Sequence, residues 1–400
     1  MDDETRYVQS NDRPVGSFDG LTAPIYRAST VVFPTASAFE RRYEQFYDGY
    51  TYGLYGTPTS RVLEKALADL ASASDTVLTP SGQSALTLTL SAFVHPGDRI
   101  LVVDTCYGPV RAYCDQYLAR LGVNVTYFDP GVGGRIDTLI DPRTRLILLE
   151  SPGSNTMEFM DVPAIAAAAR KRGCLVLMDN TWATSLLYKP HLHGVDVVVE
   201  ALSKHAAGHG DVLMGAITTV DRALFRRLKD MTRLVGLGVS ADECSLVLRG
   251  LATLPVRMAR AAETALKLAE WLHAQPSIAR VLHPAFSDCP GHDLWRRDIG
   301  RSNGLFSVVP TKTAQPNINA FVDALRLFKI GASWGGTHSL VAPQDPTGAR
   351  CATRWTEGRI VRFSVGLESP TDLLADLEQA LPRLLRKIDP ANPLLGEFVP

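Results

Sequence analysis

Short, continuously apolar runs separated by helical segments are the feature of this sequence that most restricts its fold. Four of these runs, each rich in Val, Ile and Leu, lie at 99–104, 145–150, 174–179 and 195–200. Strands that are apolar at every position are typical of parallel sheets whose two faces are covered by helices. Because helical patterns such as that at 162–172 separate the runs, strand–helix–strand units are predicted. We therefore expect residues 56–245 to form one large α/β domain with a mostly parallel sheet.

The segments on either side of this domain have a different character. A chain of 400 residues is expected to contain two or three domains. Residues 1–55 show little periodicity and are interrupted by Pro and Gly, so an extended arm that contributes to a neighbouring subunit is predicted. A helical stretch at 243–275, in which Pro255 is expected to produce a kink, precedes mixed strands and helices. Residues 246–400 are therefore predicted to form a smaller C-terminal α+β domain.

Charge and hydropathy exclude several classes of protein. The formal net charge is −1, from 41 Lys and Arg against 42 Asp and Glu, which argues against binding to nucleic acid or to an anionic membrane. The longest apolar runs are far shorter than the roughly 18 residues needed to span a bilayer. The acidic N-terminus lacks the apolar segment of a secretory signal, so a cytoplasmic location is expected.

The cysteines and histidines do not indicate a metal site. The six cysteines form no C-x-x-C pair and are expected to be reduced. His205 and His209 have the H-x-x-x-H spacing of some zinc sites, but Gly208 and Gly210 argue against the helix that this spacing requires. No metal is therefore expected.

Two sequence features suggest binding of an anion and of a cation. Residues 79–84, T-P-S-G-Q-S, lie where a strand ends and a helix begins, and the free N–H groups there suit a phosphate. The alternative is an ordinary capped turn. Asp179 ends an apolar strand, where a carboxylate is costly unless it pairs with a cation such as a protonated ring nitrogen. The alternative is helix capping by Asp179 or Asn180.

Two further residues follow predicted strands. Lys204 comes just after the strand at 195–200, and a lysine beside apolar residues can lose its proton and form an imine with an aldehyde. Its spacing of 25 residues from Asp179 corresponds to one strand–helix–strand unit, which brings both to one edge of the sheet. Tyr107 could stack on an aromatic ring and transfer protons. The alternatives are a surface lysine and a half-buried core tyrosine.

Together these features supply a phosphate site, a counter-charge for a ring nitrogen, an imine-forming lysine and a stacking ring. Pyridoxal 5'-phosphate (PLP) requires all four. A dinucleotide-binding enzyme is disfavoured because the glycine fingerprint is missing, and a serine hydrolase is disfavoured because no G-x-S-x-G is present.

The chain resembles the Cys/Met-metabolism family of PLP-dependent enzymes from about Tyr26 to Leu381. The most specific matching strings are Y-G-L-Y-G-T-P-T at 52–59, E-S-P-G-S-N-T-M-E at 150–158, D-N-T-W at 179–182, S-K at 203–204, A-S-W-G-G at 332–336, G-H-D-L-W-R-R-D at 291–298 and R-F-S-V-G-L-E at 362–368. The second and fifth strings favour the cystathionine β-lyase branch over the γ-synthase and γ-lyase branches.

The resemblance implies a fold type I enzyme that is a homotetramer of tight dimers. The catalytic residues it implies are Lys204, Tyr107 and Tyr52. Lys204 would hold the cofactor as an imine and shuttle the substrate's α-proton, Asp179 would pair with the ring nitrogen, and Tyr107 would stack on the ring. The residues implied at the cofactor phosphate are Ser81, Gly82, Gln83, Ser203 and, from a neighbouring subunit, Tyr52.

The partner implied is a small-molecule amino-acid substrate. Arg362 would bind its α-carboxylate as a bidentate fork, and Ser333 and Trp334 would border it. The sequence departs from the family at Leu54, where an arginine is usual, and at Arg233, where a tyrosine is common near the active-site entrance.

The function implied is β-elimination from L-cystathionine, which gives homocysteine, pyruvate and ammonia. One alternative is γ-elimination or γ-replacement on another amino acid by an enzyme of the same family. Another is a PLP-binding protein that has lost turnover, which the Leu54 departure makes conceivable.

Overall fold

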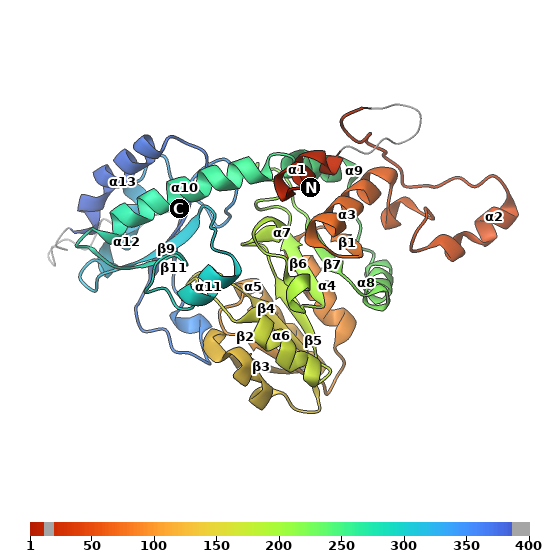
Figure 1. Cartoon of the computed structure of the whole chain (residues 1–400), viewed down its shortest axis with the longest axis horizontal. Helices are drawn as coiled ribbons and strands as arrows, with labels where there is room; N and C mark the ends of the chain where they lie inside the picture. The colour runs from red at the N-terminus through yellow and green to blue at the C-terminus, as the bar shows by residue number, and fades with distance from the viewer. Residues whose placement is uncertain (12–19, 386–400) are drawn as a thin grey trace, which may run out of the picture.

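Two sheets, each with its own helices, organise the protein. The computed structural model describes residues 1–11 and 20–385 (Figure 1). The larger sheet has the strand order β1-β7-β6-β5-β4-β2-β3. Its strands are β1 (Asp75–Thr79), β2 (Arg99–Val103), β3 (Asn124–Phe128), β4 (Thr144–Glu150), β5 (Leu175–Asp179), β6 (Val197–Ala201) and β7 (Gly215–Thr219). The second sheet has the order β10-β11-β12-β9-β8, formed by β8 (Ile278–Leu282), β9 (Leu305–Pro310), β10 (Lys329–Ile330), β11 (Leu340–Gln344) and β12 (Ile360–Ser364).

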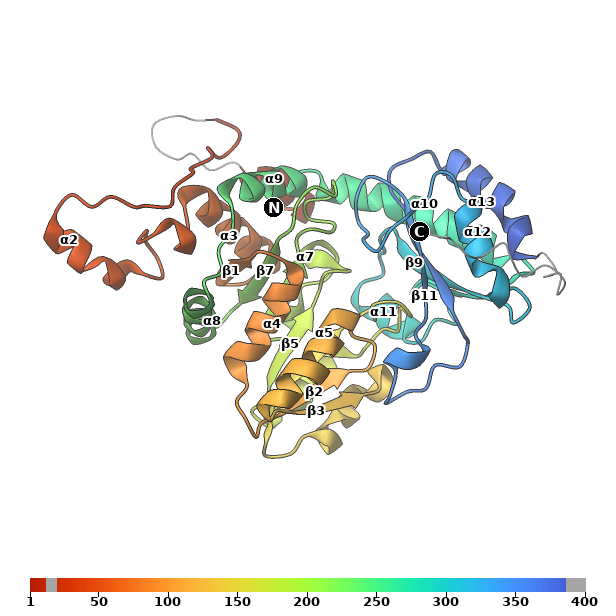
Figure 2. The same cartoon turned by 180° about the vertical axis from the view of Figure 1, so that it is seen from behind.

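Helices surround both sheets. They are α1 (Asp3–Val8), α2 (Ala36–Glu40), α3 (Pro58–Ala71), α4 (Gly82–Phe93), α5 (Gly108–Tyr113), α6 (Val162–Lys171), α7 (Thr184–Leu187), α8 (Arg222–Val235), α9 (Ala241–Leu251), α10 (Leu254–His273), α11 (His292–Asp298), α12 (Ile318–Ala324) and α13 (Pro370–Leu384). Helix α6 covers one face of the large sheet (Figure 1), and α4 and α5 cover the opposite face (Figure 2). None of the described helices combines the length and apolarity needed to cross a membrane.

The large sheet is mostly parallel, as predicted. The pairs β3–β2, β2–β4, β4–β5 and β5–β6 are parallel, and only β7 runs against its neighbours β6 and β1. The central strands are fully buried because helices cover both faces, and this accounts for their continuous apolar sequences. The carboxyl ends of β1, β2, β4, β5 and β6 consequently lie at one edge of the sheet.

The second sheet is mainly antiparallel and packs against α10, α12 and α13. Its core includes Phe306, Phe321 and Phe363. The region after residue 245 therefore contains both strands and helices, as expected. The exact domain boundaries stay a prediction.

The expected kink at Pro255 is wrong. The helical stretch is two helices, α9 and α10, and Pro255 lies in the first turn of α10. A proline is tolerated there because its missing N–H would have no partner within the helix. Along α10, Met258 packs in a cluster with α3 and α9, whereas Leu268 packs under the second sheet. This single helix thus connects the two cores.

The N-terminal residues have two different environments. Much of the segment 20–55 projects from the body with α2 at the far end (Figures 1 and 2), and Leu21 and Val32 are 85% and 88% exposed, whereas Ala23 and Phe46 are buried. Helix α1, in contrast, packs on this chain's own α3 and α10, because its Tyr7 is buried in the cluster formed by α3 and α9. An extended segment is therefore seen only from residue 20 onward.

Candidate active site

A cavity at the carboxyl edge of the large sheet contains most of the residues predicted from the sequence. Those that line it are Ser81, Gly82, Gln83, Tyr107, Asp179, Ser203, Lys204, Trp334 and Arg362. The parallel strands account for this clustering, because β1, β2, β5 and β6 each deliver a loop to the same edge. Trp334 and Arg362 come from the second sheet and its loops, so the cavity lies between the two sheets.

Lys204 lies in the turn after β6. Its Nζ donates a hydrogen bond to Ser333 Oγ at 2.8 Å and lies 5.6 Å from the centroid of the Trp334 ring. Burial, together with the nearby positive charge of Arg362, lowers the pKa of Lys204, while Asp179 acts in the opposite direction. The amine is therefore more readily deprotonated than that of a surface lysine, as imine formation requires.

Asp179 ends β5 and lines the same cavity. Its Oδ1 accepts hydrogen bonds from Thr181 N at 2.9 Å and Thr181 Oγ1 at 2.5 Å. Among residues 1–11 and 20–385, no cationic nitrogen lies within 4 Å of this carboxylate, and its Oδ2 receives no hydrogen bond. Burial raises the pKa of Asp179, against the Thr181 bonds and Lys204. A carboxylate in this position is suited to a cationic partner in the cavity.

Helix α4 begins at the cavity with the motif predicted to bind phosphate. Ser81 Oγ accepts from Ser84 N at 3.0 Å, and Ser84 Oγ accepts from Ser81 N at 2.9 Å, so the capping interpretation is confirmed. The cap occupies two of the four N–H groups that a helix start leaves without a partner, those of Ser81 and Ser84. A Cβ on Gly82 would lie 2.4 Å from that of Ala201, so the close approach of α4 to β6 requires glycine here.

The neighbouring side chain, Gln83, has a hydrogen-bond partner in the described part of the chain at only one of its two polar atoms. Its Nε2 donates to Pro109 O at 3.1 Å, whereas its buried Oε1 has no partner in the described part of the chain. Nor does the Ser203 hydroxyl bond to a described residue, although the Ser203 amide donates to Met214 O at 3.3 Å. These polar groups are available to a ligand at the start of α4.

Tyr107 stands immediately before α5, with its side chain 42% exposed at the cavity. Its backbone N–H donates to Glu150 Oε2 at 2.6 Å, which fixes the loop that carries the ring. Burial, and then the negative charges of Asp179 and Glu150, raise the pKa of the Tyr107 hydroxyl. The tyrosine is therefore neutral at physiological pH, and its ring face is accessible from the cavity.

Arg362 lies on β12 and is 8% exposed. Its Nη2 donates to Ala332 O at 2.7 Å and its Nη1 donates to Asn155 Oδ1 at 3.2 Å. No carboxylate of the described residues lies within 4 Å of this guanidinium, and burial lowers its pKa. A buried arginine without an anionic partner fits a carboxylate supplied by a ligand.

Two predicted site residues are not among those that line the cavity: Ser333, which bonds to Lys204 Nζ, and Tyr52. Tyr52 is on the projecting segment, 46% exposed, with its ring 6.0 Å from that of Tyr55. Its assignment to a neighbouring subunit's site stays a prediction. Arg233, at the end of α8, lies 5.3 Å from the Phe46 ring and 3.9 Å from Asp230, so in this chain it faces the projecting segment.

Sequence reasoning missed three residues that organise the site. Glu150 holds the Tyr107 loop, Thr181 supplies both hydrogen bonds to Asp179, and Asn155 orients Arg362. A charged residue directly after the apolar run at 146–149 is the available signal for Glu150. No local signal exists for Asn155, because its partner is 207 residues away.

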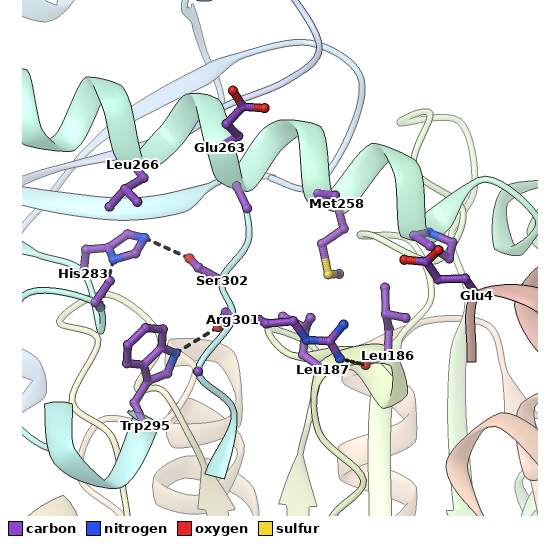
Figure 3. A pocket seen from close by; sticks show the side chains of 15 residues that line it. Glu4, Leu186, Leu187, Met258, Glu263, Leu266, His283, Trp295, Arg301 and Ser302 are labelled. Carbon is purple, nitrogen blue, oxygen red and sulfur yellow. Dashed lines mark hydrogen bonds between the residues drawn. The ribbon is translucent and has the colours of Figure 1, made fainter. Parts of the chain in front are cut away.

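A second cavity lies where α10 passes the large sheet and contains none of the predicted residues (Figure 3). Its polar groups are largely satisfied by one another. Arg301 Nη2 donates to Leu186 O at 2.8 Å, Trp295 Nε1 donates to Arg301 O at 2.9 Å, and His283 Nε2 lies 2.8 Å from Ser302 Oγ. These bonds join α7 to the segment before β9, so this cavity is part of the contact between the two cores.

No group of three or more His, Cys, Asp or Glu side chains suitable for a metal occurs in the part of the chain that the structure describes. His209 Nδ1 lies 2.6 Å from Ala207 O, and the ring of the buried His205 lies 5.2 Å from that of Trp334.

The residues of the first cavity fit PLP. Asp179 offers a carboxylate without a cation, Lys204 an amine of lowered pKa, and α4 a helix start beside the unpaired Gln83 oxygen. Each of these matches one part of the cofactor: ring nitrogen, aldehyde and phosphate.

Comparison with known proteins gives one consistent family. The model of the family described as "Cys/Met metabolism PLP-dependent enzyme" matches residues 4–382. The chain is 40% identical over 368 residues to cystathionine beta-lyase of Bordetella avium, covering 91% of this chain and 92% of that protein. It is 35% identical over 390 residues to cystathionine beta-lyase MetC of Escherichia coli (strain K12), covering 96% and 98%.

The fold is also similar to a solved structure. Cystathionine gamma synthase from Xanthomonas oryzae pv. oryzae, in complex with aminoacrylate and cysteine, superposes with a TM-score of 0.87 at 29% identity, covering 96% of this chain and 98% of that one. The predicted α/β architecture of fold type I and the predicted PLP cofactor are confirmed.

Proposed function

Because the chain belongs to the family of Cys/Met metabolism PLP-dependent enzymes, we propose that it is a carbon–sulfur β-lyase that cleaves L-cystathionine to homocysteine, pyruvate and ammonia. The observation that carries the proposal is the convergence of Lys204, Asp179 and Arg362 on one cavity. The β-lyase names of relatives 35% and 40% identical support this branch of the family.

The cofactor-binding roles follow from the chemistry of the cavity. Asp179 pairs with the ring nitrogen, and Tyr107 provides the stacking face. Ser81, Gly82, Gln83 and Ser203 hold the phosphate at the start of α4. When bound, PLP supplies an electron sink that stabilises negative charge at the substrate's α-carbon.

Lys204 moves the proton. Its hydrogen bond to Ser333 holds Nζ in the cavity, and its lowered pKa makes the neutral amine accessible. The amine removes the α-proton. The C–S bond then breaks with its electron pair going to the sulfur, which takes the proton from the amine and leaves as the thiol. Water then converts the three-carbon fragment into pyruvate and ammonia.

Arg362 binds the α-carboxylate of the substrate. Asn155 and the Ala332 carbonyl hold the guanidinium, which leaves its remaining donors for two parallel hydrogen bonds to a carboxylate. Trp334 and Ser333 border the same space.

The remaining expectations are part of the same proposal. Tyr52 completes the phosphate site and assists catalysis from a neighbouring subunit, in a cytoplasmic homotetramer built from dimers. The exposed apolar residues of segment 20–55, such as Leu21 and Val32, are consistent with a segment that packs on another chain. Boundaries after residues 55 and 245, which separate the arm, the large domain and the small domain, are also part of the proposal.

The test is the ketoacid formed from L-cystathionine by the purified protein, with and without added PLP. Pyruvate together with free homocysteine is the expected result. The absence of pyruvate would overturn the β-lyase assignment.

A γ-elimination or γ-replacement enzyme is the second candidate, because the chain is also similar to the Xanthomonas cystathionine gamma synthase. The departures at Leu54 and Arg233 lie at positions that could change substrate preference. γ-Elimination would give 2-oxobutyrate in the same assay. Bound PLP without any product would instead indicate a protein that has lost turnover.

A further inference from the structure

Glu150 is not the only other carboxyl group of the described residues near Asp179. Glu200 is on β6, next to β5, and its side chain lines a small internal pocket with Leu67, Ala216 and Thr218. Its Oε1 accepts a hydrogen bond from Ser185 Oγ at 2.6 Å and a longer one from Asn180 Nδ2 at 3.4 Å. The roles proposed above do not use this group.

These bonds connect Glu200 to the segment that positions Asp179. Asn180 directly follows Asp179, and its backbone N–H donates to Val199 O at 2.8 Å. Thr181 comes next and supplies both hydrogen bonds to the Asp179 carboxylate, while its Oγ1 accepts from Ala201 N at 2.9 Å. Glu200 therefore stabilises, through Asn180, the turn whose next residue holds Asp179.

The charges around Glu200 are few. Asp179 is the neighbouring carboxyl group on β5, and beside it on β4 lies Glu150, whose pKa is raised by burial and then by Asp179. Tyr7 of α1 is a buried phenol whose pKa is raised well above its usual range, first by burial and then by Glu200. Beyond Tyr7 lie Asp3 and Arg301. Across Thr218, His191 is neutral because burial lowers its pKa. No cationic nitrogen of residues 1–11 or 20–385 lies within 4 Å of Glu200.

We propose that Glu200 is a positioning residue for Asp179 that also strengthens its hold on the protonated cofactor ring when Glu200 ionises. This rests on the proposed pairing of Asp179 with the ring nitrogen. Two nearby carboxylates repel each other in the protein alone, and a cation bound to one of them relieves the repulsion.

The pH range in which this effect operates follows from burial. Burial raises the pKa of Glu200 to about 7, against the hydrogen bonds from Ser185 and Asn180. Below this value Glu200 is neutral and adds no charge to the site. Above this value Glu200 carries a negative charge, which favours binding of a cationic ring. The affinity of the wild type for the ring should therefore rise with pH more steeply than that of a protein without the Glu200 charge.

The experiment measures the PLP dissociation constant of the full-length apoprotein between pH 6 and pH 8 for the wild type and Glu200→Gln. Gln retains an acceptor for Ser185 but has no charge. We expect the ratio of the Glu200→Gln constant to the wild-type constant to increase roughly threefold or more from pH 6 to pH 8, equivalent to about half a pKa unit of coupling. A ratio that does not change with pH would overturn the charge effect.

Two further variants separate charge from structure. Ser185→Ala removes the 2.6 Å hydrogen bond but no charge. Because this bond lowers the pKa of Glu200, the rise in PLP affinity with pH should persist in Ser185→Ala but occur at higher pH. Glu200→Asp keeps the charge and should restore the wild-type pH dependence. If Glu200→Gln does not fold, Glu200→Leu provides the neutral variant without an unpaired polar group in the pocket.

The positioning effect is measured separately, from the PLP dissociation constants of Ser185→Ala and the wild type at pH 6. At this pH Glu200 is mostly neutral, so its charge contributes little. Weaker binding by Ser185→Ala at this pH is expected if the hydrogen bonds hold the turn, and unchanged binding would overturn the positioning role.

The outcome is distinguishable from failure of the proposed function. If Glu200→Gln binds PLP with the same pH dependence as the wild type, only the inference about Glu200 is rejected. Production of 2-oxobutyrate rejects the β-lyase assignment and leaves the PLP titrations interpretable. A PLP affinity that is unchanged in Asp179→Ala would reject the pairing on which both rest.

Discussion

Lys204 Nζ lies 2.8 Å from Ser333 Oγ, and this hydrogen bond joins the edge of the large sheet to a loop between β10 and β11 of the second sheet. The two residues are 129 positions apart. The amine that is proposed to move the proton is thus oriented by a hydroxyl from the other core, so the relative placement of the two sheets affects catalysis directly.

Replacement of Lys204 by alanine should abolish both turnover and the visible absorption band of the bound cofactor. Among the residues that the structure describes, no other lysine lines the cavity, so none of them can replace the amine. Absorption spectra and ketoacid assays test this. Lys65→Ala, which changes an exposed lysine paired with Asp69 on α3, should retain both properties. Retention of both by the Lys204 variant would refute its role.

Ser333→Ala should lower kcat by roughly tenfold, because loss of one hydrogen bond is worth about 1 to 1.5 kcal/mol. The amine remains but is less well oriented. Steady-state kinetics at saturating substrate give the comparison. Ser302→Ala, in the second cavity, is the matched control and should leave kcat unchanged. An unaltered kcat in Ser333→Ala would show that Ser333 does not orient the amine.

Arg362→Lys should raise KM by roughly 10- to 100-fold, because a lysine cannot form two parallel hydrogen bonds to a carboxylate and charge-assisted bonds are worth about 1.5 to 3 kcal/mol. The effect on kcat should be smaller. Kinetics with L-cystathionine, or with whichever amino acid is turned over, test this. The control is Arg359→Lys, whose Nη2 bonds to Asn319 away from the cavity. An unchanged KM would argue against carboxylate binding by Arg362.

Gly82→Ala should weaken PLP binding. The added Cβ would lie 2.4 Å from Ala201 Cβ, so the start of α4 must move away from β6 and from the proposed phosphate position. Equilibrium titration of the apoprotein with PLP measures the change. At Gly348 an added Cβ meets nothing within 4 Å, so Gly348→Ala should bind PLP normally. Equal affinity of the two variants would contradict the proposed phosphate site.

Asp104 should make stability depend on pH in the acid range. Its carboxylate accepts hydrogen bonds from the N–H groups of Cys351, Ala352 and Thr353 and from Arg111, joining the loop before β12 to the end of β2. Burial acts to raise its pKa, but these donors outweigh burial and lower the pKa to about 2.

Because the folded pKa lies below that of an unfolded aspartate, the stabilisation is present above about pH 4 and is lost as the pH falls toward 2. It amounts to about 2 kcal/mol. Asp104→Asn should be less stable than the wild type at pH 7, and the difference should shrink toward pH 2. Chemical unfolding across this range provides the measurement, with the exposed Asp288→Asn as control. A difference that does not vary with pH would contradict this.

Much of the large sheet could be predicted from the sequence. Strands such as β2 and β5 are found within one residue of the predicted ranges, because their burial on both faces imposes a continuous apolar pattern. Short strands with mixed patterns, such as β10 and β11, were not predicted, since half-buried positions leave no such pattern. The break between α9 and α10 was interpreted as a kink, because a proline in the first turn of a helix looks the same in sequence as one within a helix.

The sequence alone determined that Asp179 and Lys204 would lie at one edge of a parallel sheet, because one strand–helix–strand unit returns the chain to the same edge. Only the tertiary structure decided which groups surround them. Ser333 beside Lys204, Asn155 beside Arg362 and Glu200 behind Asp179 depend on the packing of strands and loops rather than on local pattern. Hydrogen bonds between residues far apart in the chain leave no periodicity, so their partners become identifiable only when the folded chain brings them together.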